Sequence, residues 1–373
     1  MEQLTIREAV TRRELKDFIF LPEQVHAREP EWLHPIYADE KLLFDKKRNK
    51  SYRYADTIML LAYRGKRCVG RVMGIVNRRY NEIHGVDDGR FCFMECYNER
   101  IVYTALMNAV EAWLREQGMK RIIGPLGFSD KDPQGFQVEG FKLPQVMTSA
   151  TNSPYMALFT EKGGFRKKVD LVNYVGKFPD VFPEVYERVL ERVNGQGEYK
   201  IVEFGSIREL RPHITGILEV MNQSFSEIYG FVPLNDGEKM EFANRYLPVL
   251  DPKFVKIVMA GGRIVAFAIG IPDLSEGIRA VRGRLFPLGF LKVMRASKRS
   301  KKLLMMLGGV CPEYRGKGLD VLMGVKILKS GIEHGMEQLD SHLVLEDNAR
   351  MRSEYERVGC EVVKRFRIYE KDL

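Results

Sequence analysis

The sequence has few cysteines and histidines, and neither type is arranged for cross-linking or for metal binding. Its 373 residues contain five cysteines and six histidines. Cys92 and Cys96 lie close together, but no second cysteine pair and no nearby histidine completes a zinc pattern. No His-x-x-x-His spacing occurs either. The composition therefore argues against a disulfide scaffold and a metal site, and it favours a reducing compartment.

Long apolar runs are also missing. No stretch approaches the roughly 18 consecutive apolar residues that a membrane-spanning helix needs. The first residues, MEQLTIREAVTRREL, are charged and lack the apolar core of a signal peptide. We therefore expect a cytoplasmic protein, with peripheral contact at the inner membrane face as a further option.

Acidic residues are absent from one strongly basic segment. The chain has 59 Lys and Arg against 50 Asp and Glu, and nine of the basic residues lie in residues 277–302. The rest of the chain is therefore neutral. Within 279–302 the basic residues alternate with Leu and Phe, which is typical of contact with an anionic membrane surface. A solvated basic loop is the alternative; nucleic acid is not expected, because no recognised binding module accompanies the segment.

The sequence repeats itself at a nearly constant offset. VGRVMGI (69–75) matches VAFAIGI (265–271), and NSPYMALFTEKGG (152–164) matches NARMRSEYERVGC (348–360), both at 196 residues. ALMNAVEAWLREQGM, starting at residue 105, parallels VLMGVKILKSGIEHGM, starting at residue 321. Matches in the same order indicate two copies of one fold.

Each copy has the pattern of a mixed α/β domain. Apolar runs such as TIMLLAY and KLLMMLGGV have the length of strands, and YTALMNAVEAWLREQG has apolar residues at helical spacing. The length of the chain also favours two domains. We predict an N-terminal domain at 1–178, a helix and linker at 179–199, and a C-terminal domain at 200–373.

One glycine-rich stretch, CPEYRGKGLDVLM (311–323), joins a predicted strand to a predicted helix. A helix N-terminus has unpaired N–H groups that suit an anion. Gly316 and Gly318 would let the backbone approach a diphosphate, and Arg315 and Lys317 would add positive charge. The alternative is a plain strand-to-helix turn with solvated basic side chains.

The residues around this stretch resemble the GNAT superfamily of acyl-CoA N-acyltransferases. That family has V-x-P-x-x-(R/Q)-G-x-G-x-(G/A), followed by N-x-x-A-x-x-x-Y-x-x-x-G-F. The first motif is matched by Val310, Pro312, Arg315, Gly316 and Gly318, and the second by Asn348, Tyr355 and Gly359. Asp320 and Cys360 depart from the pattern. The resemblance implies a mixed α/β fold with two tandem GNAT-like domains.

The resemblance also implies roles for individual residues. Acetyl-CoA or a longer acyl-CoA would bind through Val310, Arg315, Gly316, Lys317, Gly318, Leu319 and Asn348, with no metal. Tyr355 would protonate the departing thiolate as general acid, and a core aromatic is the alternative. Glu346 is our expected base; pairing with Arg350 at the surface is its alternative. Asp320 would repel a diphosphate unless it points away.

The N-terminal copy lacks these functional residues. At an offset of 216, Glu99 and Val102 stand where Arg315 and Gly318 do, and Phe159 stands in place of Tyr355. We expect this copy to bind no cofactor. Its insertion at 124–145 has carboxylates that either face an amine substrate or cap an ordered loop, namely Asp130, Asp132 and Glu139.

The function expected from the resemblance is acyl transfer from CoA to an amine, most simply acetyl transfer. The acceptor is a small-molecule or lipid amine. Two alternatives remain: a non-catalytic binding protein at a membrane surface, or a long-chain N-acyltransferase acting on a lipid amino alcohol.

Overall fold

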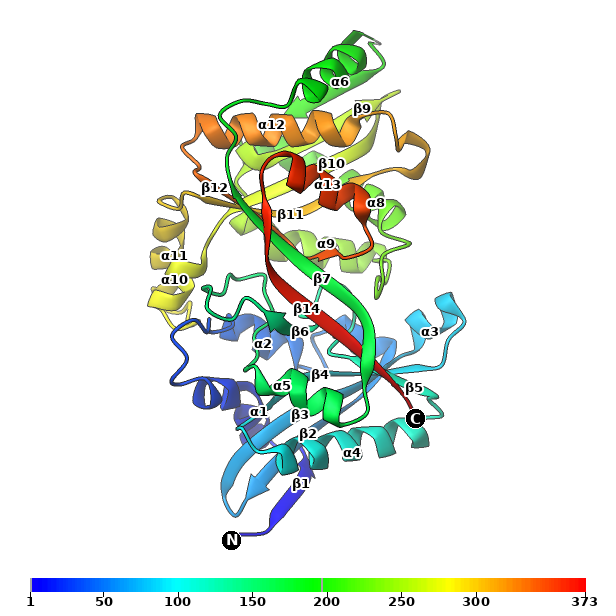
Figure 1. Cartoon of the computed structure of the whole chain (residues 1–373), viewed down its shortest axis with the longest axis vertical. Coiled ribbons are helices and arrows are strands. Elements are labelled where there is room, and N and C mark those ends of the chain that lie inside the picture. Colours follow the sequence, from blue (N-terminus) through cyan, green and yellow to red (C-terminus); the bar gives the residue numbers. More distant parts are fainter. Residues whose placement is uncertain (1, 196) are drawn as a thin grey trace. The chain divides into compact units, whose positions relative to one another are not determined.

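The computed structural model describes residues 2–195 and 197–373 and separates the chain into two compact units (Figure 1). Unit 1 comprises Met1–Val172, Ser275–Met294 and Lys364–Leu373, and unit 2 comprises Asn173–Leu274 and Arg295–Val363. Each unit therefore contains segments from both halves of the sequence. The bounds 1–178, 179–199 and 200–373 stay a prediction about the two sequence copies.

Unit 1 is built on a sheet with strand order β1-β2-β3-β4-β5-β14. Neighbouring strands are antiparallel except for β4 and β5, which are parallel. The strands are β1 (Leu4–Glu8), β2 (Ala55–Arg64), β3 (Arg67–Asn77), β4 (Asp88–Cys96), β5 (Arg121–Gly124), β6 (Phe136–Glu139), which pairs with β14, and β14 (Glu361–Asp372). The helices are α1 (Arg12–Val25), α2 (Tyr37–Leu43), α3 (Arg78–His84), α4 (Arg100–Glu116), α5 (Tyr155–Lys162) and α10 (Ser275–Ala280).

Unit 2 repeats this arrangement. Its strand order is β8-β9-β10-β11-β12-β7, with β11 and β12 as the parallel pair. The strands are β8 (Tyr199–Glu203), β9 (Val255–Ala260), β10 (Arg263–Pro272), β11 (Lys302–Val310), β12 (Gln338–Ser341), β13 (Val344–Leu345) and β7 (Arg166–Lys177). The helices are α6 (Glu184–Gly195), α7 (Ile207–Leu210), α8 (Ile214–Ser224), α9 (Asp236–Tyr246), α12 (Leu319–Glu333) and α13 (Ala349–Arg357), and α11 (Gly289–Ser297) continues from unit 1. The predicted duplication of one mixed α/β fold is confirmed.

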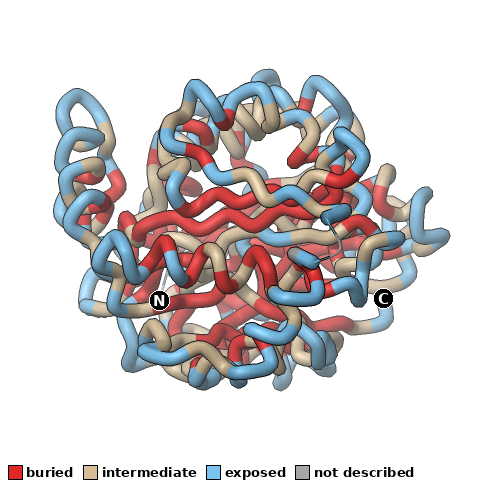
Figure 2. Tube along the Cα trace, turned by 90° about the horizontal axis from the view of Figure 1, so that it is seen from above, coloured by how far each residue is buried: buried red, intermediate tan, exposed pale blue. Residues whose placement is uncertain are grey.

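Apolar periodicity explains how the helices pack. In α4 the apolar positions Val102, Leu106, Val110 and Leu114 recur every four residues, and all four side chains are fully buried. The corresponding α12 buries Leu322, Val325 and other apolar residues in the same way. Figure 2 shows the buried residues gathered along the strands, with exposed residues on the outer helices and loops. In the described part of the chain, no helix is both long and apolar enough to cross a membrane.

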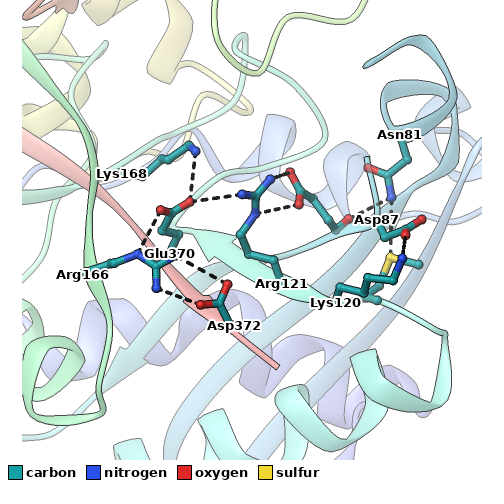
Figure 3. Close-up of polar contacts among 10 residues, drawn as sticks. Asn81, Asp87, Lys120, Arg121, Arg166, Lys168, Glu370 and Asp372 are labelled. Atoms are coloured by element: carbon teal, nitrogen blue, oxygen red, sulfur yellow. Dashed lines mark hydrogen bonds and ion pairs between the residues drawn. The ribbon is translucent and has the colours of Figure 1, made fainter. Parts of the chain in front are cut away.

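The two copies exchange the ends of their last strands. β14 closes the second copy in sequence, yet its end pairs with β5 of unit 1, where Tyr369 lies opposite Gly124. Ion pairs reinforce this position (Figure 3): the Glu370 carboxylate contacts Arg166 at 3.2 Å and Lys168 at 3.0 Å. Likewise, β7 closes the first copy, but its end pairs with β12 in unit 2.

Candidate active site

The parallel strands β11 and β12 of unit 2 separate partway along their length. Their register runs from Lys302 opposite Gln338 to Met305 opposite Ser341. β11 continues to Val310 along β10, while β13, the next strand after β12, pairs with β7 instead. Residues 306–310 are half-buried or exposed. Their backbone N–H and C=O groups on the β12 side can therefore bond to an extended ligand, as expected for the strand that ends at Val310.

The glycine-rich loop follows β11 directly and leads into α12. Gly316 has φ +78° and Gly318 has φ +86°, so both occupy the left-handed region that only glycine enters readily. Gly318 is the N-cap of α12 and supplies no side-chain cap. The first N–H groups of a 15-residue helix are thus left for another acceptor, and the helix dipole favours an anionic one. This backbone fits the phosphate loop that the sequence predicts.

The charged side chains of the loop, Arg315 and Lys317, contact other groups of the protein. The Arg315 guanidinium donates to Glu227 at 2.8 Å and to the Ser224 carbonyl at 3.0 Å. The Lys317 ammonium lies 4.8 Å from the centroid of the Tyr314 ring. Backbone amides, rather than the Arg315 side chain, are therefore the main anion donors that this loop offers.

Asp320, the residue that departs from the family pattern, is paired. Arg350 donates from Nε and Nη2 to the same Asp320 oxygen, at 3.0 and 2.6 Å. The two residues lie in the first turns of α12 and α13. The pair neutralises the carboxylate next to the loop.

The residues of the second motif lie on or next to α13. Asn348 is the N-cap of α13, and its Oδ1 accepts from the Met351 N–H at 3.1 Å. Its Nδ2 group is then the part of the side chain that can donate to a ligand carbonyl. Tyr355 is only 8% exposed, and its ring stacks on Tyr174 with centroids 5.5 Å apart. Burial, and then the nearby Cys360 and Asp340, raise the pKa of Tyr355, so its phenol stays protonated at neutral pH.

Residues from β7 complete this region, and sequence reasoning missed them. The Tyr174 hydroxyl donates to Glu356 at 2.6 Å and accepts from Arg352 Nε at 3.0 Å. Arg352 also donates to the Glu346 carbonyl at 2.9 Å, which places Glu346 beside this cation. Asn173, the residue before Tyr174, donates to the buried Asp340 at 2.7 Å. No local signal marks Asn173 or Tyr174, because their partners lie about 170 residues later in the chain.

The equivalent region of unit 1 is built differently. Glu99 is the N-cap residue of α4, so the helix starts place it opposite Gly318, the N-cap of α12, and not opposite Arg315 as the offset of 216 predicts. Its carboxylate pairs with Arg64 at 2.6 Å. The Val102 side chain is fully buried against the core. The Phe159 ring packs against the rings of Tyr103 and Tyr155, with ring centroids 5.8 and 5.4 Å apart. An acid at the helix start and an aromatic without a hydroxyl lack the chemistry of the loop and acid in unit 2.

The carboxylates of the 124–145 insertion make local contacts. Asp132 accepts from the Ser129 N–H at 3.3 Å, and Asp130 pairs with its neighbour Lys131 at 3.0 Å. Glu139 lies 3.4 Å from Arg365. These contacts favour the ordered-loop interpretation over presentation of the carboxylates to an amine.

Two curated proteins match nearly the whole chain. Bacterial ceramide synthase of Caulobacter vibrioides is 26% identical over 381 residues, which cover 99% of this chain and 98% of that protein. Protein YghO of Escherichia coli is 25% identical over 378 residues, which cover 99% and 95% of the two chains. No protein-family model matches the sequence.

Solved structures with the same fold cover the whole chain as well. A tandem GNAT protein from the clavulanic acid biosynthesis pathway matches 99% of this chain and 98% of its own, with a TM-score of 0.56 and 12% identity. A GCN5-related N-acetyltransferase from Sphaerobacter thermophilus matches 99% and 95%, with a TM-score of 0.52 and 13% identity. The predicted fold class is confirmed: the chain is a two-domain protein with the tandem GNAT fold.

Proposed function

We propose that the protein is an acyl-CoA-dependent N-acyltransferase whose chemistry resides in unit 2. The observation that carries this proposal is one continuous backbone surface. It begins where β11 separates from β12 and ends at the Gly316–Gly318 turn before α12. A pantetheine arm is extended and polar and would pair with the strand backbone, while a pyrophosphate would accept from the amides of residues 315–319.

The side chains around this surface fit the steps of amide formation. The amine attacks the thioester carbonyl, the C–N bond forms, the C–S bond breaks, and the products are an amide and the CoA thiol. Tyr355 is the proposed general acid, because its buried phenol retains the proton that the leaving sulfur takes up. Glu346, directly or through water, is the proposed acceptor of the amine proton. Asn348 Nδ2 would hold a pantetheine carbonyl.

The proposed acceptor is a long-chain lipid amino alcohol, and the proposed donor is a long-chain acyl-CoA. The similarity to the bacterial ceramide synthase, end to end at 26% identity, favours this pair over a short acyl group and a soluble amine. Acetyl transfer is the second candidate, supported by the fold of the N-acetyltransferases. We propose a cytoplasmic location, and a scaffold role for the copy in unit 1.

Two measurements test this proposal. Calorimetry with acetyl-CoA and with a long-chain acyl-CoA asks whether unit 2 binds the donor, and we expect tighter binding of the long-chain form. Release of CoA thiol, followed with a thiol reagent, then compares a long-chain amino alcohol with short soluble amines. If neither acyl-CoA binds, the enzyme assignment is wrong and a non-catalytic binding protein is the better description.

Tyr355→Phe tests the acid directly. Loss of the phenolic proton donor should lower turnover by roughly 10²- to 10⁴-fold and leave acyl-CoA affinity nearly unchanged. Tyr174→Phe is the matched control, because it removes the hydroxyl of the stacked partner ring. Equal losses of turnover in the two variants, or a large loss of affinity in Tyr355→Phe, would contradict the role given to Tyr355.

A further inference from the structure

Large apolar side chains are exposed together in one segment of unit 1, residues 285–291, which follows α10 and includes the first residues of α11 (yellow in Figure 1). We call this segment the tip. Phe286 is 78% exposed, Leu288 64%, Leu291 54% and Phe290 44%. Other exposed large apolar residues are spread along the sequence singly or in pairs. Four such side chains within six residues form an exposed apolar cluster of the kind that marks a binding surface.

The residues just before the tip, 279–284, are held against the rest of unit 1 by hydrogen bonds. Arg279 donates to the carbonyls of Pro30 and Trp32 at 2.8 and 2.9 Å. Arg284 donates to both oxygens of Glu23, at 3.2 and 2.8 Å. The Gly283 carbonyl accepts from the N–H of Tyr37, the first residue of α2, at 3.1 Å. The apolar side chains are therefore exposed on a fixed base.

Close packing adds to this attachment. Gly283 has φ +69°, and a Cβ there would lie 2.0 Å from the Pro35 carbonyl oxygen, so only glycine fits. Ile278 before the tip and Val293 after it are buried. The segment before the tip is thus fixed by hydrogen bonds and by buried Ile278, and the segment after it by buried Val293.

Not all of the basic residues in the segment are available to a partner. Arg279 and Arg284 are used in the contacts above, Lys301 pairs with Glu337 at 2.5 Å, and Lys302 lies 3.7 Å from Asp340. The remaining five are exposed and have no carboxylate partner within residues 2–195 and 197–373: Arg282, Lys292, Arg295, Lys298 and Arg299. Arg282 and Lys292 flank the apolar tip directly.

Helix α11 also places apolar and basic side chains next to each other on its exposed side. Val293 and Ser297 lie on its buried face. Leu291 and Arg295 are one turn apart on its exposed side, so an apolar and a cationic side chain share that side. Apolar residues therefore lie at and near the tip, and cations lie beside them.

We propose that this tip docks the protein on an anionic lipid bilayer. Phe286, Leu288, Phe290 and Leu291 enter the boundary between headgroups and acyl chains, and Arg282, Lys292 and Arg295 bind the headgroup phosphates. The charge is complementary to an anionic leaflet, and the apolar tip requires a partner with a hydrocarbon interior. Nucleic acid offers the charge but no apolar phase to accept two Phe and two Leu side chains. This proposal is independent of the proposed chemistry in unit 2.

Co-sedimentation of the full chain with lipid vesicles tests the proposal. We expect binding to phosphatidylcholine vesicles that contain about 30 mol% phosphatidylglycerol, and much weaker binding to pure phosphatidylcholine. The variant F286S/L288S/L291S should bind the anionic vesicles at least roughly tenfold more weakly, because the apolar contribution is gone. R282Q/K292Q/R295Q should lose the preference for the anionic lipid.

A matched control separates the tip from general surface hydrophobicity. I83S/I101S/L158S removes three apolar side chains of unit 1 that are 52%, 63% and 55% exposed elsewhere, and it should bind vesicles like the wild type. In F286W the emission should shift to shorter wavelength on binding, as a tryptophan enters the interface. Circular dichroism confirms that each variant is folded.

Three results would overturn the proposal. The tip variant could sediment with anionic vesicles as well as the wild type does. The wild type could fail to bind vesicles and form a dimer that the tip variant does not form, which would make the tip a contact with a second copy of the chain. It could instead bind an RNA or DNA duplex, but no vesicles, through the residues changed in the charge variant.

Discussion

Gly316 and Gly318 have similar backbone conformations but different surroundings, which permits a quantitative test of the loop. An alanine in the left-handed region costs about 1–2 kcal/mol at either position. A Cβ at Gly316 meets no atom within 4 Å, whereas a Cβ at Gly318 lies 2.6 Å from Val189 Cγ1 and 3.3 Å from Val193 Cγ2, both on α6. Gly318→Ala should therefore cost about 1–3 kcal/mol more than Gly316→Ala.

Thermal unfolding of the two variants measures this difference. For a unit of this size, each kcal/mol corresponds to about 2–4 °C in Tm, so Gly318→Ala should unfold several degrees below Gly316→Ala. Val189→Ala introduced into the Gly318→Ala background removes the colliding methyl group and should recover part of the loss. Equal Tm values for the two glycine variants, or no recovery with Val189→Ala, would refute the proposed packing of α6 on the loop.

Two further predictions concern charge. Arg350→Ala leaves the Asp320 carboxylate unpaired beside the proposed phosphate site. Since one charge at this range contributes about 1 kcal/mol, this variant should bind acyl-CoA on the order of fivefold more weakly. Asp320→Asn removes the negative charge and should bind acyl-CoA more tightly. Calorimetry at low and high salt checks the opposite signs, and the same sign in both variants would contradict the assignment. Burial alone would lower the pKa of His26, but the Glu95 and Glu29 carboxylates raise it to about 9. Its stabilisation of unit 1 is therefore complete below the ordinary value of 6.5 and is lost as the pH rises through about 9. The difference in Tm between the wild type and His26→Gln should shrink from near pH 6 to near pH 9.5; a constant difference would show that the imidazolium does not contribute in this way.

Much of the fold and part of the site could be predicted from the sequence, because their signals are local. The duplication is visible as repeated apolar patterns, and a helix such as α4 shows its buried face in the spacing of Val102, Leu106 and Val110. The loop is equally local: glycines at 316 and 318 between a strand and a helix predict a helix start whose backbone a ligand can approach closely. Both glycines have positive φ in the structure. The roles of Tyr355, Asn348 and Glu346 stay predictions that the experiments above address.

Other features depend on partners that no local pattern identifies. Asp320 departs from the family pattern in the loop, and its charge is balanced by Arg350, 30 positions away in the chain. In the sequence, all basic residues of the segment 279–302 look alike. Only the structure distinguishes Arg279 and Arg284, which bond to other parts of unit 1, from the cations that have no carboxylate partner in the described part of the chain.

The sequence by itself thus determined the two copies, their secondary structure and the glycine loop, since backbone preference and apolar periodicity act between near neighbours. The tertiary structure alone decided how the last strands are exchanged. β7 of the first copy brings Asn173 and Tyr174 beside Asp340 and Tyr355 of the second. β14 of the second copy carries Glu370 to Arg166 in unit 1. Partner residues lie 161 to 165 positions apart where β7 pairs with β12, and 245 to 251 positions apart where β14 pairs with β5. Such pairing depends on the whole assembled sheet, because every strand presents the same backbone groups to any neighbour.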